Sequence, residues 1–419
     1  MVFKGGTGNP GSAFVFCGIP RLYPTLPVRS GPAPVPEAGR PGTGNYGAPP
    51  RDTAAPGRNE FWQVNHVVSS QNKIPVGILG ATGIVGQRFL SLLADHPWFE
   101  PVWLAASERS AGRTYAEAVR WRLKTPIPER FAKLPVSEAT PHGCPARVIF
   151  AALDAGIAAR LEPEFVAAGH VVISNSSALR MVSDVPLLVP EVNADHLNLI
   201  EQQPAWRERR ACAVTNPNCS TVGLVMALAP LQQRFGIEKV SVVTMQAVSG
   251  AGYPGVPSLD ILGNVVPFIN NEEDKLETEA QKILGILKDG QIHSSGFAVS
   301  AHCNRVPVED GHMESVSVKL KSTASIEEVK QAMREFRGVP QELNLPTAPA
   351  QPVMVTDAPD RPQPRFDAET GRGMTAVVGR VRPCPLFDIK FTVLSHNTIR
   401  GAAGAAVLNA ELMYAQNKL

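Results

Sequence analysis

A strand, a glycine-rich turn and a helix follow one another within residues 74–94, and this succession constrains the fold most strongly. Residues 74–80 form a short apolar run typical of a buried strand, and residues 87–94 have the apolar spacing of a helix. The connecting sequence Gly80-Ala-Thr-Gly-Ile-Val-Gly86 permits a tight turn and lets the backbone approach a pyrophosphate at the helix N-terminus. We therefore predict a Rossmann unit with a dinucleotide site. The residues predicted to line this site are Gly80, Ala81, Thr82, Gly83, Ile84 and Val85.

Alternating apolar runs and helices continue beyond this unit. The runs at residues 101–106, 147–152 and 170–174 predict strands, and a helix is expected at about residues 157–168. Such alternation predicts a parallel sheet, in which ligands bind beyond the carboxyl ends of the strands. Arg180 follows the last of these strands and is a candidate anion-binding residue, with a surface arginine as the alternative. The glycine sequence at residues 80–86 has the spacing G-x-x-G-x-x-G, which is less common in dinucleotide sites than G-x-G-x-x-G. The alternative for this sequence is a turn that serves only the packing of an α/β fold.

The loop after the second strand favours NADP over NAD. An NAD site places Asp or Glu at this strand end to hold the ribose 2′-hydroxyl, whereas this chain has Ser107 there. Arg109 and Ser110 follow closely, and a guanidinium group and hydroxyls suit a 2′-phosphate. Glu108 argues against this interpretation, and a solvated polar loop is the alternative for each residue. On balance the loop predicts NADP(H) as the cofactor.

Cys219 lies where a turn meets the start of a helix. The strand-like residues 213–215 end in Asn216-Pro-Asn218, which is turn chemistry, and an apolar helical run follows at residues 221–230. The N–H groups and the dipole at a helix N-terminus favour an anion, so we expect the Cys219 thiol to be shifted toward the thiolate. This predicts an activated nucleophile, with a buried structural cysteine as the alternative.

The second half of the chain combines strands with helices. A strand at residues 239–248 leads into a glycine-rich loop at residues 249–255, which could approach a nicotinamide or a substrate. The composition of the charged helix at residues 271–284 predicts a solvated face. His312 follows a Glu-Asp-Gly turn and can project into a cleft, although a single histidine is usually not catalytic. Further predicted elements are a strand and turn at 297–312, strands at 313–320, 371–381 and 387–394, and a closing helix at about 401–417.

Composition argues against several other classes of protein. With 419 residues the chain is long enough for two or three domains, and a formal net charge of +2 gives no electrostatic reason to bind nucleic acid or an anionic membrane. The six cysteines lack zinc-ligand spacing, so we predict no metal site. No apolar run reaches the length of a membrane span, and reduced cysteines in the cytoplasm are the simplest expectation.

Residues 1–70 differ from the remainder because Gly, Pro, Arg, Ser and Thr dominate them. Their periodic apolar content is too low to offset the entropy of ordering, so we predict a disordered extension. The segment has no clean signal-peptide core, and a targeting segment and an over-extended start site are both open.

Five segments, taken together and in order, resemble aspartate-semialdehyde dehydrogenases of the branch common in archaea and fungi. The resemblance spans roughly residues 74–419. One departure is the loop at residues 150–156, which differs from the Ser-Ala-Leu-Pro pattern expected at the edge of the cofactor. The segments are Gly80-Ala-Thr-Gly-Ile-Val-Gly86, Asn216-Pro-Asn-Cys-Ser-Thr221, Glu272-Glu-Asp-Lys275, Cys303-Asn-Arg-Val-Pro-Val-Glu-Asp-Gly-His312 and Asp357-Ala-Pro-Asp-Arg-Pro-Gln-Pro-Arg365.

The resemblance implies NADPH-dependent conversion of L-4-aspartyl phosphate to L-aspartate 4-semialdehyde, in the biosynthesis of lysine, threonine, methionine and isoleucine. It implies that Cys219 is the nucleophile, that His312 is the general acid/base and that Gln246 positions the substrate. The implied substrate contacts are Arg305 for the α-carboxylate, Arg180 and Lys275 for the acyl phosphate, Glu272 for the amino group, and Asn218. The implied cofactor contacts are the loop at residues 80–85, Ser107, Ser249, Gly250 and Asn397. A homodimer or homotetramer is also implied.

The predicted fold class is therefore α/β. We expect a Rossmann NADP-binding domain over residues 71–218, completed by a C-terminal helix at residues 398–419. Residues 219–397 are expected to form an α+β catalytic and dimerisation domain with a mixed or antiparallel sheet. The nearest alternative function is a malonyl-CoA or succinyl-CoA reductase on the same scaffold, but Glu272 suits a substrate ammonium group and favours the aspartyl substrate. A non-catalytic NADP-binding protein is the alternative from another class.

Overall fold

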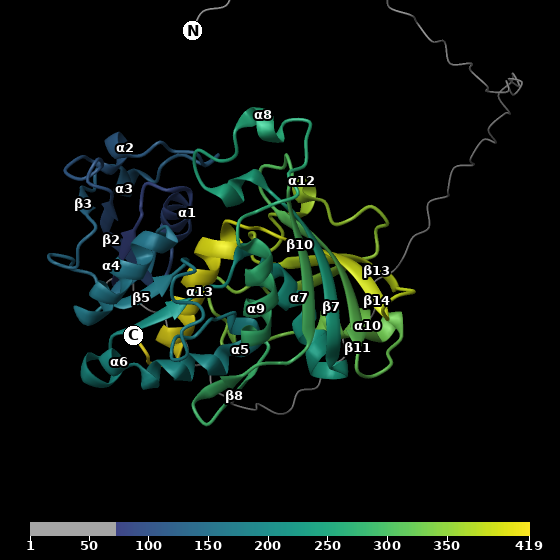
Figure 1. Ribbon diagram of the computed structural model, residues 1–419. Helices are drawn as coiled ribbons and strands as arrows, with labels where there is room; N and C mark the ends of the chain where they lie inside the picture. Colours follow the sequence, from purple (N-terminus) through teal and green to yellow (C-terminus); the bar gives the residue numbers. More distant parts are fainter. Residues whose placement is uncertain (1–72) are drawn as a thin grey trace, which may run out of the picture. The chain divides into compact units, whose positions relative to one another are not determined.

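The computed structural model describes residues 73–419, and the predictions made for residues 1–70 lie outside this part (Figure 1). Within the described residues the strands form two six-stranded sheets and one two-stranded hairpin. Helices accompany both larger sheets, so the predicted α/β class is confirmed. No helix in this part is long and apolar enough to cross a membrane.

The first sheet is parallel throughout and has the strand order β3-β2-β1-β4-β5-β6. This is the 3-2-1-4-5-6 order of a doubly wound Rossmann fold, so that prediction is confirmed. The winding reverses between β1 and β4, which is where ligands bind in such sheets. The strands are β1 (Ile74–Leu79), β2 (Phe99–Ala106), β3 (Val136–Glu138), β4 (Val148–Ala151), β5 (Val171–Ser174) and β6 (Cys212–Thr215).

Helices connect the strands of the first sheet. All residues of β4, β5 and β6 are buried, as expected for parallel strands with both faces covered. The connecting elements are α1 (Ile84–Leu93), α2 (Tyr115–Ala118), α3 (Glu129–Ala132), α4 (Ala155–Ala167), α5 (Pro190–Asn193), a 3-10 helix at Ala194–Gln202 and α6 (Pro204–Arg209).

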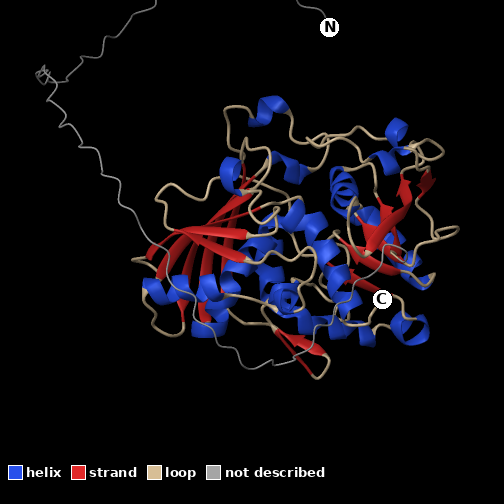
Figure 2. Ribbon diagram, turned by 180° about the vertical axis from the view of Figure 1, so that it is seen from behind, coloured by secondary structure: helices blue, strands red, loops and turns tan. Residues whose placement is uncertain are grey.

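The second sheet is mixed and has the strand order β10-β7-β11-β14-β13-β12. β7 pairs parallel with β10 and antiparallel with β11. The last residues of β7 and β10 and the first residues of β11 therefore lie side by side at the same end of the sheet. Figure 2 shows helices lying along one face of these strands. The strands are β7 (Ile237–Gln246), β10 (Ala298–Arg305), β11 (His312–Leu320), β12 (Val353–Thr356), β13 (Ala376–Pro383) and β14 (Ile389–Ser395).

The helix α7 (Cys219–Phe235) packs on this second sheet. Its residues 220–231 are all buried, because α7 contacts β11 and β14 as well as α9 and the C-terminal segment. This explains why its sequence is apolar on all sides. The remaining elements of this half are α8 (Ser258–Ile261), α9 (Glu272–Ile283), β8 (Ile286–Lys288), β9 (Gln291–His293), α10 (Ile326–Glu335), α11 (Val339–Glu342), α12 (Pro364–Asp367) and a 3-10 turn at Val248–Ala251.

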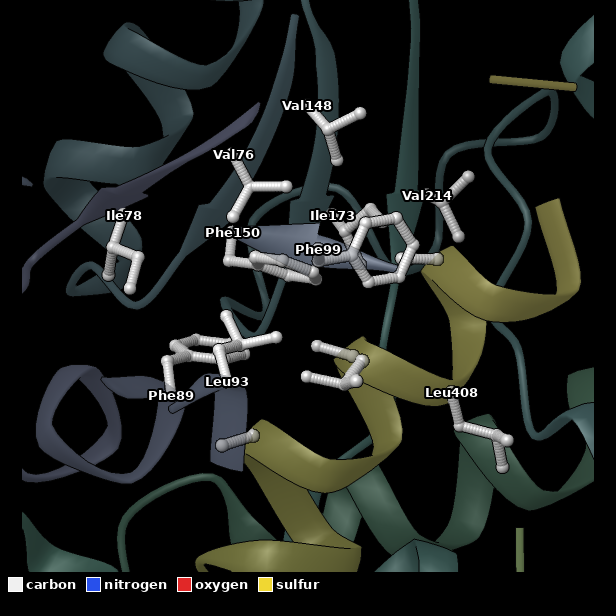
Figure 3. Close-up of a cluster of buried hydrophobic side chains, with 14 of the residues drawn as sticks. Val76, Ile78, Phe89, Leu93, Phe99, Val148, Phe150, Ile173, Val214 and Leu408 are labelled. Carbon is white, nitrogen blue, oxygen red and sulfur yellow. The ribbon is translucent and has the colours of Figure 1, made fainter. Parts of the chain in front are cut away.

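The C-terminal segment returns to the first sheet. A π-helical turn at Ile399–Ala403 leads into α13 (Gly404–Ala415), where the closing helix was predicted. Leu408 of α13 joins the same hydrophobic cluster as Val76 of β1 and Phe150 of β4 (Figure 3). The C-terminal helix therefore contributes to the core of the Rossmann sheet.

One predicted strand begins later than expected. The strand predicted at residues 371–381 starts only at Ala376. Gly371, Arg372 and Gly373 have φ values of 59°, 58° and 77°, which lie in the left-handed region and cannot continue an extended strand.

Candidate active site

Cys219 is the first residue of α7 and follows directly from the end of β6 through the Asn216-Pro-Asn218 turn. The side-chain oxygen of Asn218 accepts hydrogen bonds from the N–H groups of Ser220 (2.9 Å) and Thr221 (3.3 Å). Asn218 is therefore the N-cap of α7. The predicted junction of turn and helix is confirmed, although the helix begins two residues earlier than the apolar run suggested.

The thiol of Cys219 contacts the imidazole of His312. The distance from Cys219 Sγ to His312 Nε2 is 3.2 Å. The other ring nitrogen, Nδ1, accepts a hydrogen bond of 3.1 Å from the backbone N–H of Ala247. An acceptor Nδ1 carries no proton, so the proton of the neutral imidazole lies on Nε2 and faces the sulfur. Burial, together with Arg305 and His396, holds the pKa of His312 well below its usual value.

The expectation of a thiolate at Cys219 is wrong for this structure. Burial, followed by the nearby carboxylate of Glu272, raises the pKa of the Cys219 thiol to about 12. Arg305, Arg180 and Lys275 oppose this rise without overcoming it. The resting pair is a neutral thiol beside a neutral imidazole.

Three strand ends place further predicted residues around this pair. Gln246 ends β7 and is paired with Arg305, which ends β10, while His312 starts the antiparallel β11. Arg305 Nη1 donates a hydrogen bond of 2.8 Å to the carbonyl of Ala247. Gln246 is buried and its amide donates to Thr244 Oγ1 at 3.3 Å.

Gly250 lies against both Arg305 and His312. A Cβ atom at this position would be 2.9 Å from Arg305 Nη1 and 2.9 Å from His312 Nε2. Any side chain would therefore displace one of these groups, which explains glycine at this point of the loop.

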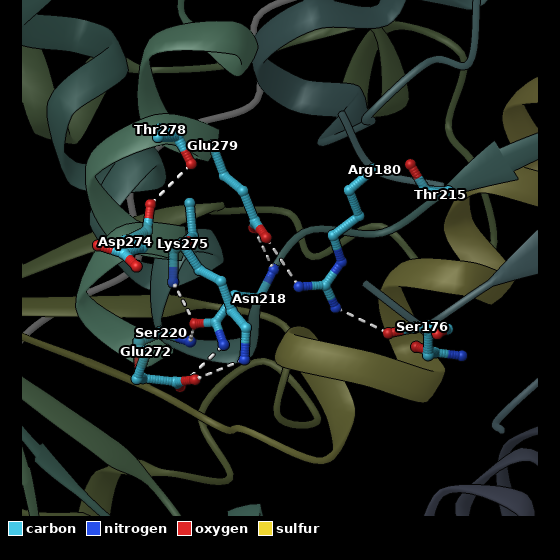
Figure 4. A network of polar contacts seen from close by, with 12 residues as sticks. Ser176, Arg180, Thr215, Asn218, Ser220, Glu272, Asp274, Lys275, Thr278 and Glu279 are labelled. Atoms are coloured by element: carbon cyan, nitrogen blue, oxygen red, sulfur yellow. Dashed lines mark hydrogen bonds and ion pairs between the residues drawn. The ribbon is translucent and has the colours of Figure 1, made fainter. Parts of the chain in front are cut away.

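The helix α9 brings charged residues to the same place. Glu272 Oε1 accepts a hydrogen bond of 2.8 Å from the Asn218 side chain, and its Oε2 accepts one of 3.2 Å from Lys275 Nζ (Figure 4). Glu272, Glu279 and Lys282 are only 5%, 2% and 9% exposed. The solvated face predicted from the composition of this helix is therefore wrong, because its charged side chains pair with one another and with the nucleophile loop.

Arg180 is buried and held from two sides. Its Nη1 lies 2.8 Å from Glu279 Oε1, and its Nη2 donates a hydrogen bond of 2.7 Å to the carbonyl of Asn175. Sequence reasoning selected Arg180 but missed Glu279 and Lys282. A signal was present, because residues 272, 275, 279 and 282 have the spacing of one helix face.

A close glycine contact packs the C-terminal segment onto the nucleophile. Gly401 lies in the π-helical turn Ile399–Ala403, and a Cβ there would be 2.7 Å from Cys219 Cβ and 3.0 Å from its carbonyl oxygen. The side chain of Asn216 donates to the carbonyl of Ala402 at 2.9 Å and fixes the same contact from the turn. π-Helical turns are frequent at functional sites. No signal in the sequence could join residues 219 and 401.

The start of the Rossmann fold fits a pyrophosphate. Gly80 has φ +78°, and a Cβ on Gly86 would collide with the carbonyl oxygens of Gly80 and Ala81. The N-cap of α1 is Gly83, which offers no side-chain cap, and no acidic residue occupies the first turn. The N–H groups at this helix start are therefore open to an anion. The residues predicted for this contact, 80–85, all lie in this turn and first helical residues.

The other predicted cofactor residues lie on two loops. Ser107 and Arg109 are exposed beyond the end of β2, in a turn closed by a 2.8 Å hydrogen bond from Ser110 N to the Ser107 carbonyl. Ser249 accepts a hydrogen bond of 2.8 Å from the side chain of Asn397 and borders a cavity of about 300 Å³. Within residues 73–419, the 107–110 turn makes no hydrogen bond or ion pair with the group around Cys219.

Comparison with known proteins agrees with this geometry. The family model for the NAD-binding domain of semialdehyde dehydrogenases matches residues 75–200, and that for their dimerisation domain matches residues 228–400. A curated aspartate-semialdehyde dehydrogenase from Methanothermobacter thermautotrophicus is 49% identical over 343 residues, which cover 81% of this chain and 99% of that protein. The chain belongs to the aspartate-semialdehyde dehydrogenase family.

Fungal members of the aspartate-semialdehyde dehydrogenase family are similarly related. The one from Aspergillus fumigatus is 48% identical over 82% of this chain and 98% of its own length. A crystal structure of the Candida albicans enzyme with NADP matches with a TM-score of 0.77 and 44% identity, covering 83% of this chain and 100% of that one. The family suggested by the five sequence segments is therefore confirmed.

Proposed function

We propose that this chain reduces L-4-aspartyl phosphate to L-aspartate 4-semialdehyde with NADPH and releases phosphate, a step toward lysine, threonine, methionine and isoleucine. The observation that carries the proposal is the 3.2 Å contact between Cys219 Sγ and His312 Nε2, beside the guanidinium of Arg305. A thiol, an imidazole and an anion-binding group are what acyl transfer through a thioester needs. Curated relatives at 44–49% identity carry the name of this activity.

The charged side chains around Cys219 suit the charges of this substrate. We assign Arg305 to the α-carboxylate, because its planar group can bind two oxygens at once. Arg180 and Lys275 are assigned to the acyl phosphate, and the carboxylate of Glu272 to the substrate ammonium group. Asn218, which already contacts Glu272, and Gln246, at the end of β7, complete the substrate site.

The proposed chemistry starts at the sulfur. Cys219 Sγ attacks the acyl carbon, the bond between that carbon and the phosphate oxygen breaks, and the thiol proton passes to the departing phosphate, so that a thioester and free phosphate result. NADPH, when bound, supplies the hydride that reduces the thioester carbon. The Nε2–H of His312 lies beside the sulfur and can stabilise the negative oxygen that then forms. That oxygen re-forms a carbonyl, the carbon–sulfur bond breaks, and the sulfur recovers the electron pair and takes up a proton from water.

The residues that would hold NADP(H) are the glycine turn and two loops. The open N–H groups at the start of α1 suit the pyrophosphate, and the exposed turn after β2 has a guanidinium and hydroxyls for a 2′-phosphate. The 249–250 segment reaches the Cys219–His312 pair and suits the nicotinamide end. The assigned residues are Gly80, Ala81, Thr82, Gly83, Ile84, Val85, Ser107, Arg109, Ser110, Ser249, Gly250 and Asn397.

We further propose a division of the chain into two functional parts and an assembly of copies. Residues 71–218 with 398–419 would bind the cofactor, and residues 219–397 would hold the substrate and pair with another copy. The matched dimerisation-domain family supports the pairing, in a homodimer or homotetramer. Val243 of β7, which is 38% exposed, is one apolar side chain of the second sheet that such a contact could cover. Five free cysteines among the described residues fit a reducing compartment such as the cytoplasm.

The reverse reaction tests the proposed function. The wild-type protein is given L-aspartate 4-semialdehyde, NADP and phosphate, and the absorbance of NADPH is followed. Turnover that requires phosphate is the expected result. Absence of this turnover, together with NADPH oxidation by malonyl-CoA or succinyl-CoA, would replace the substrate and keep the fold and the nucleophile.

Replacing Gly401 by alanine is expected to lower turnover about 100-fold. The new methyl group would push on Cys219, and displacing a reacting atom by about 1 Å costs roughly that factor. The matched control is Gly404→Ala, whose methyl would meet Met374 and Ile399 and would not meet Cys219. Both variants should lower the melting temperature through overpacking, but only Gly401→Ala should lower kcat strongly. Equal kcat values for the two variants would contradict the assigned role.

A further inference from the structure

Glu279 of α9 joins two segments that are far apart in the sequence. Its Oε1 lies 2.8 Å from Arg180 Nη1, and its Oε2 accepts a hydrogen bond of 2.6 Å from the backbone N–H of Asn218. The side chain is only 2% exposed, and Figure 4 shows it between its two partners. One buried carboxylate therefore touches the guanidinium assigned to the phosphate and the residue that precedes the nucleophile.

Both partners of Glu279 use it as an acceptor. The guanidinium of Arg180 and the N–H of Asn218 can only donate hydrogen bonds. A carboxylate has two acceptor oxygens and satisfies both, whereas an amide side chain has one acceptor and one donor group. The position therefore requires a side chain with two acceptor oxygens.

Lys282, three residues further along α9, holds the backbone that carries Arg180. Its ammonium group donates to the carbonyls of Arg180, Val182 and Val185 at 2.7, 2.8 and 3.0 Å. These three bonds use all three of its protons, so Lys282 holds the loop and has no proton left for a ligand. One face of α9 thus fixes the backbone of the Arg180 loop through Lys282 and the side chain of Arg180 through Glu279.

We propose that Glu279 is a positioning residue that couples the binding of phosphate at Arg180 to the placement of Cys219. This inference rests on the proposed function, in which Arg180 binds the phosphate group. A shift of the carboxylate would move the guanidinium and the N-cap of α7 together, since both are bonded to it. Phosphate binding and the rate of the acyl transfer should therefore change together.

The variant Glu279→Gln tests the coupling in the reverse reaction. One of the two hydrogen bonds is lost in this variant. A charge-assisted hydrogen bond typically changes an equilibrium constant, such as a binding constant, by a factor of about ten or more. The expected result is a KM for phosphate raised about tenfold or more, with a reduced kcat and a nearly unchanged KM for L-aspartate 4-semialdehyde. A purely structural role would instead lower the melting temperature and leave the ratio of the two KM values unchanged.

The matched control is Glu277→Gln on the same helix. Glu277 also accepts a backbone N–H, that of Ala301 at 2.9 Å, but it contacts neither Arg180 nor Asn218. It should keep the wild-type KM for phosphate. If Glu279→Gln and Glu277→Gln give the same KM for phosphate and the same kcat, the inference is overturned.

A shorter carboxylate covers the case in which Glu279→Gln does not fold. Glu279→Asp keeps both acceptor oxygens but withdraws them by one methylene, so the protein should fold and still show a raised KM for phosphate. Wild-type kinetics in Glu279→Asp would also overturn the inference. Failure of the proposed function is distinguishable, because then the wild-type protein itself lacks phosphate-dependent turnover.

Discussion

Replacing Cys219 by alanine should reduce phosphate-dependent turnover in both directions by on the order of 10⁴-fold or more, because no thioester can form without the sulfur. The side chain is small and sits at the first residue of α7, where the cap is supplied by Asn218 and stays in place. The melting temperature should therefore change little. The measurement is NADPH absorbance in both directions beside a thermal melt.

A second cysteine serves as the control. Cys384 lies beyond the end of β13 and contacts none of the residues around Cys219. Cys384→Ala should keep wild-type turnover. If Cys219→Ala retained more than about a tenth of wild-type turnover, another group would have to be the nucleophile, and the assignment made from the helix start would fall.

The pH dependence of alkylation adds a quantitative part to this prediction. A thiol whose pKa is raised to about 12 is almost entirely protonated at pH 7. Its reaction with iodoacetamide should then accelerate about tenfold per pH unit between roughly pH 7 and 9. Mass spectrometry of the Cys219 peptide, compared with the Cys384 peptide, measures this. An alkylation rate that does not change with pH near neutrality would show that Cys219 is a thiolate, as the helix N-terminus predicts.

The parts of this fold that the sequence predicts well depend on local signals. The glycine turn at residues 80–86 and the Asn216-Pro-Asn218 turn are read from residues that lie next to one another in the chain. The alternation of apolar runs and helices then leaves few possible topologies, and the parallel first sheet is one of them. Of the substrate contacts, only Arg180 is a candidate from its place after a predicted strand; the others are implied by the family resemblance alone.

The errors concern properties that depend on distant parts of the chain. The composition of α9 indicated a solvated face, yet Glu279 is buried because it pairs with Arg180, 99 positions away. The helix start at Cys219 indicated a thiolate, yet burial by other elements dominates the pKa. The sequences around Gly401 and around Cys219 contain no signal that predicts the contact between these two residues. In each case the deciding energy term is desolvation or packing, which is fixed only when the elements come together.

Replacing His312 should distinguish two roles for its imidazole. As a full proton carrier it must gain and lose a proton at Nε2 during turnover, and any variant without an imidazole should fail equally. As a neutral donor it only needs an N–H near the sulfur. The hydrogen bond from Ala247 N to Nδ1 favours the second role, because a doubly protonated ring would turn its Nδ1–H against that N–H.

We therefore expect His312→Gln to be the better of two variants. Its side-chain amide can place an N–H near the former Nε2, so it should keep turnover within roughly tenfold to a hundredfold of wild type. His312→Ala removes the donor entirely and should lose on the order of 10³-fold, the typical effect of deleting an oxyanion donor. Equal losses in both variants would instead support full proton transfer.

The pH profile gives an independent check on the same histidine. Burial, together with the neighbouring Arg305 and His396, holds its folded pKa well below the usual value near 6.5. The neutral form, which donates from Nε2, therefore persists as the pH falls through about 6.5, and protonation sets in only further down. The kcat/KM profile of the wild-type protein should show no acid limb near pH 6.5. A limb there that disappears in His312→Gln would mean that the ring titrates as an ordinary histidine, and the neutral-donor role would have to be abandoned.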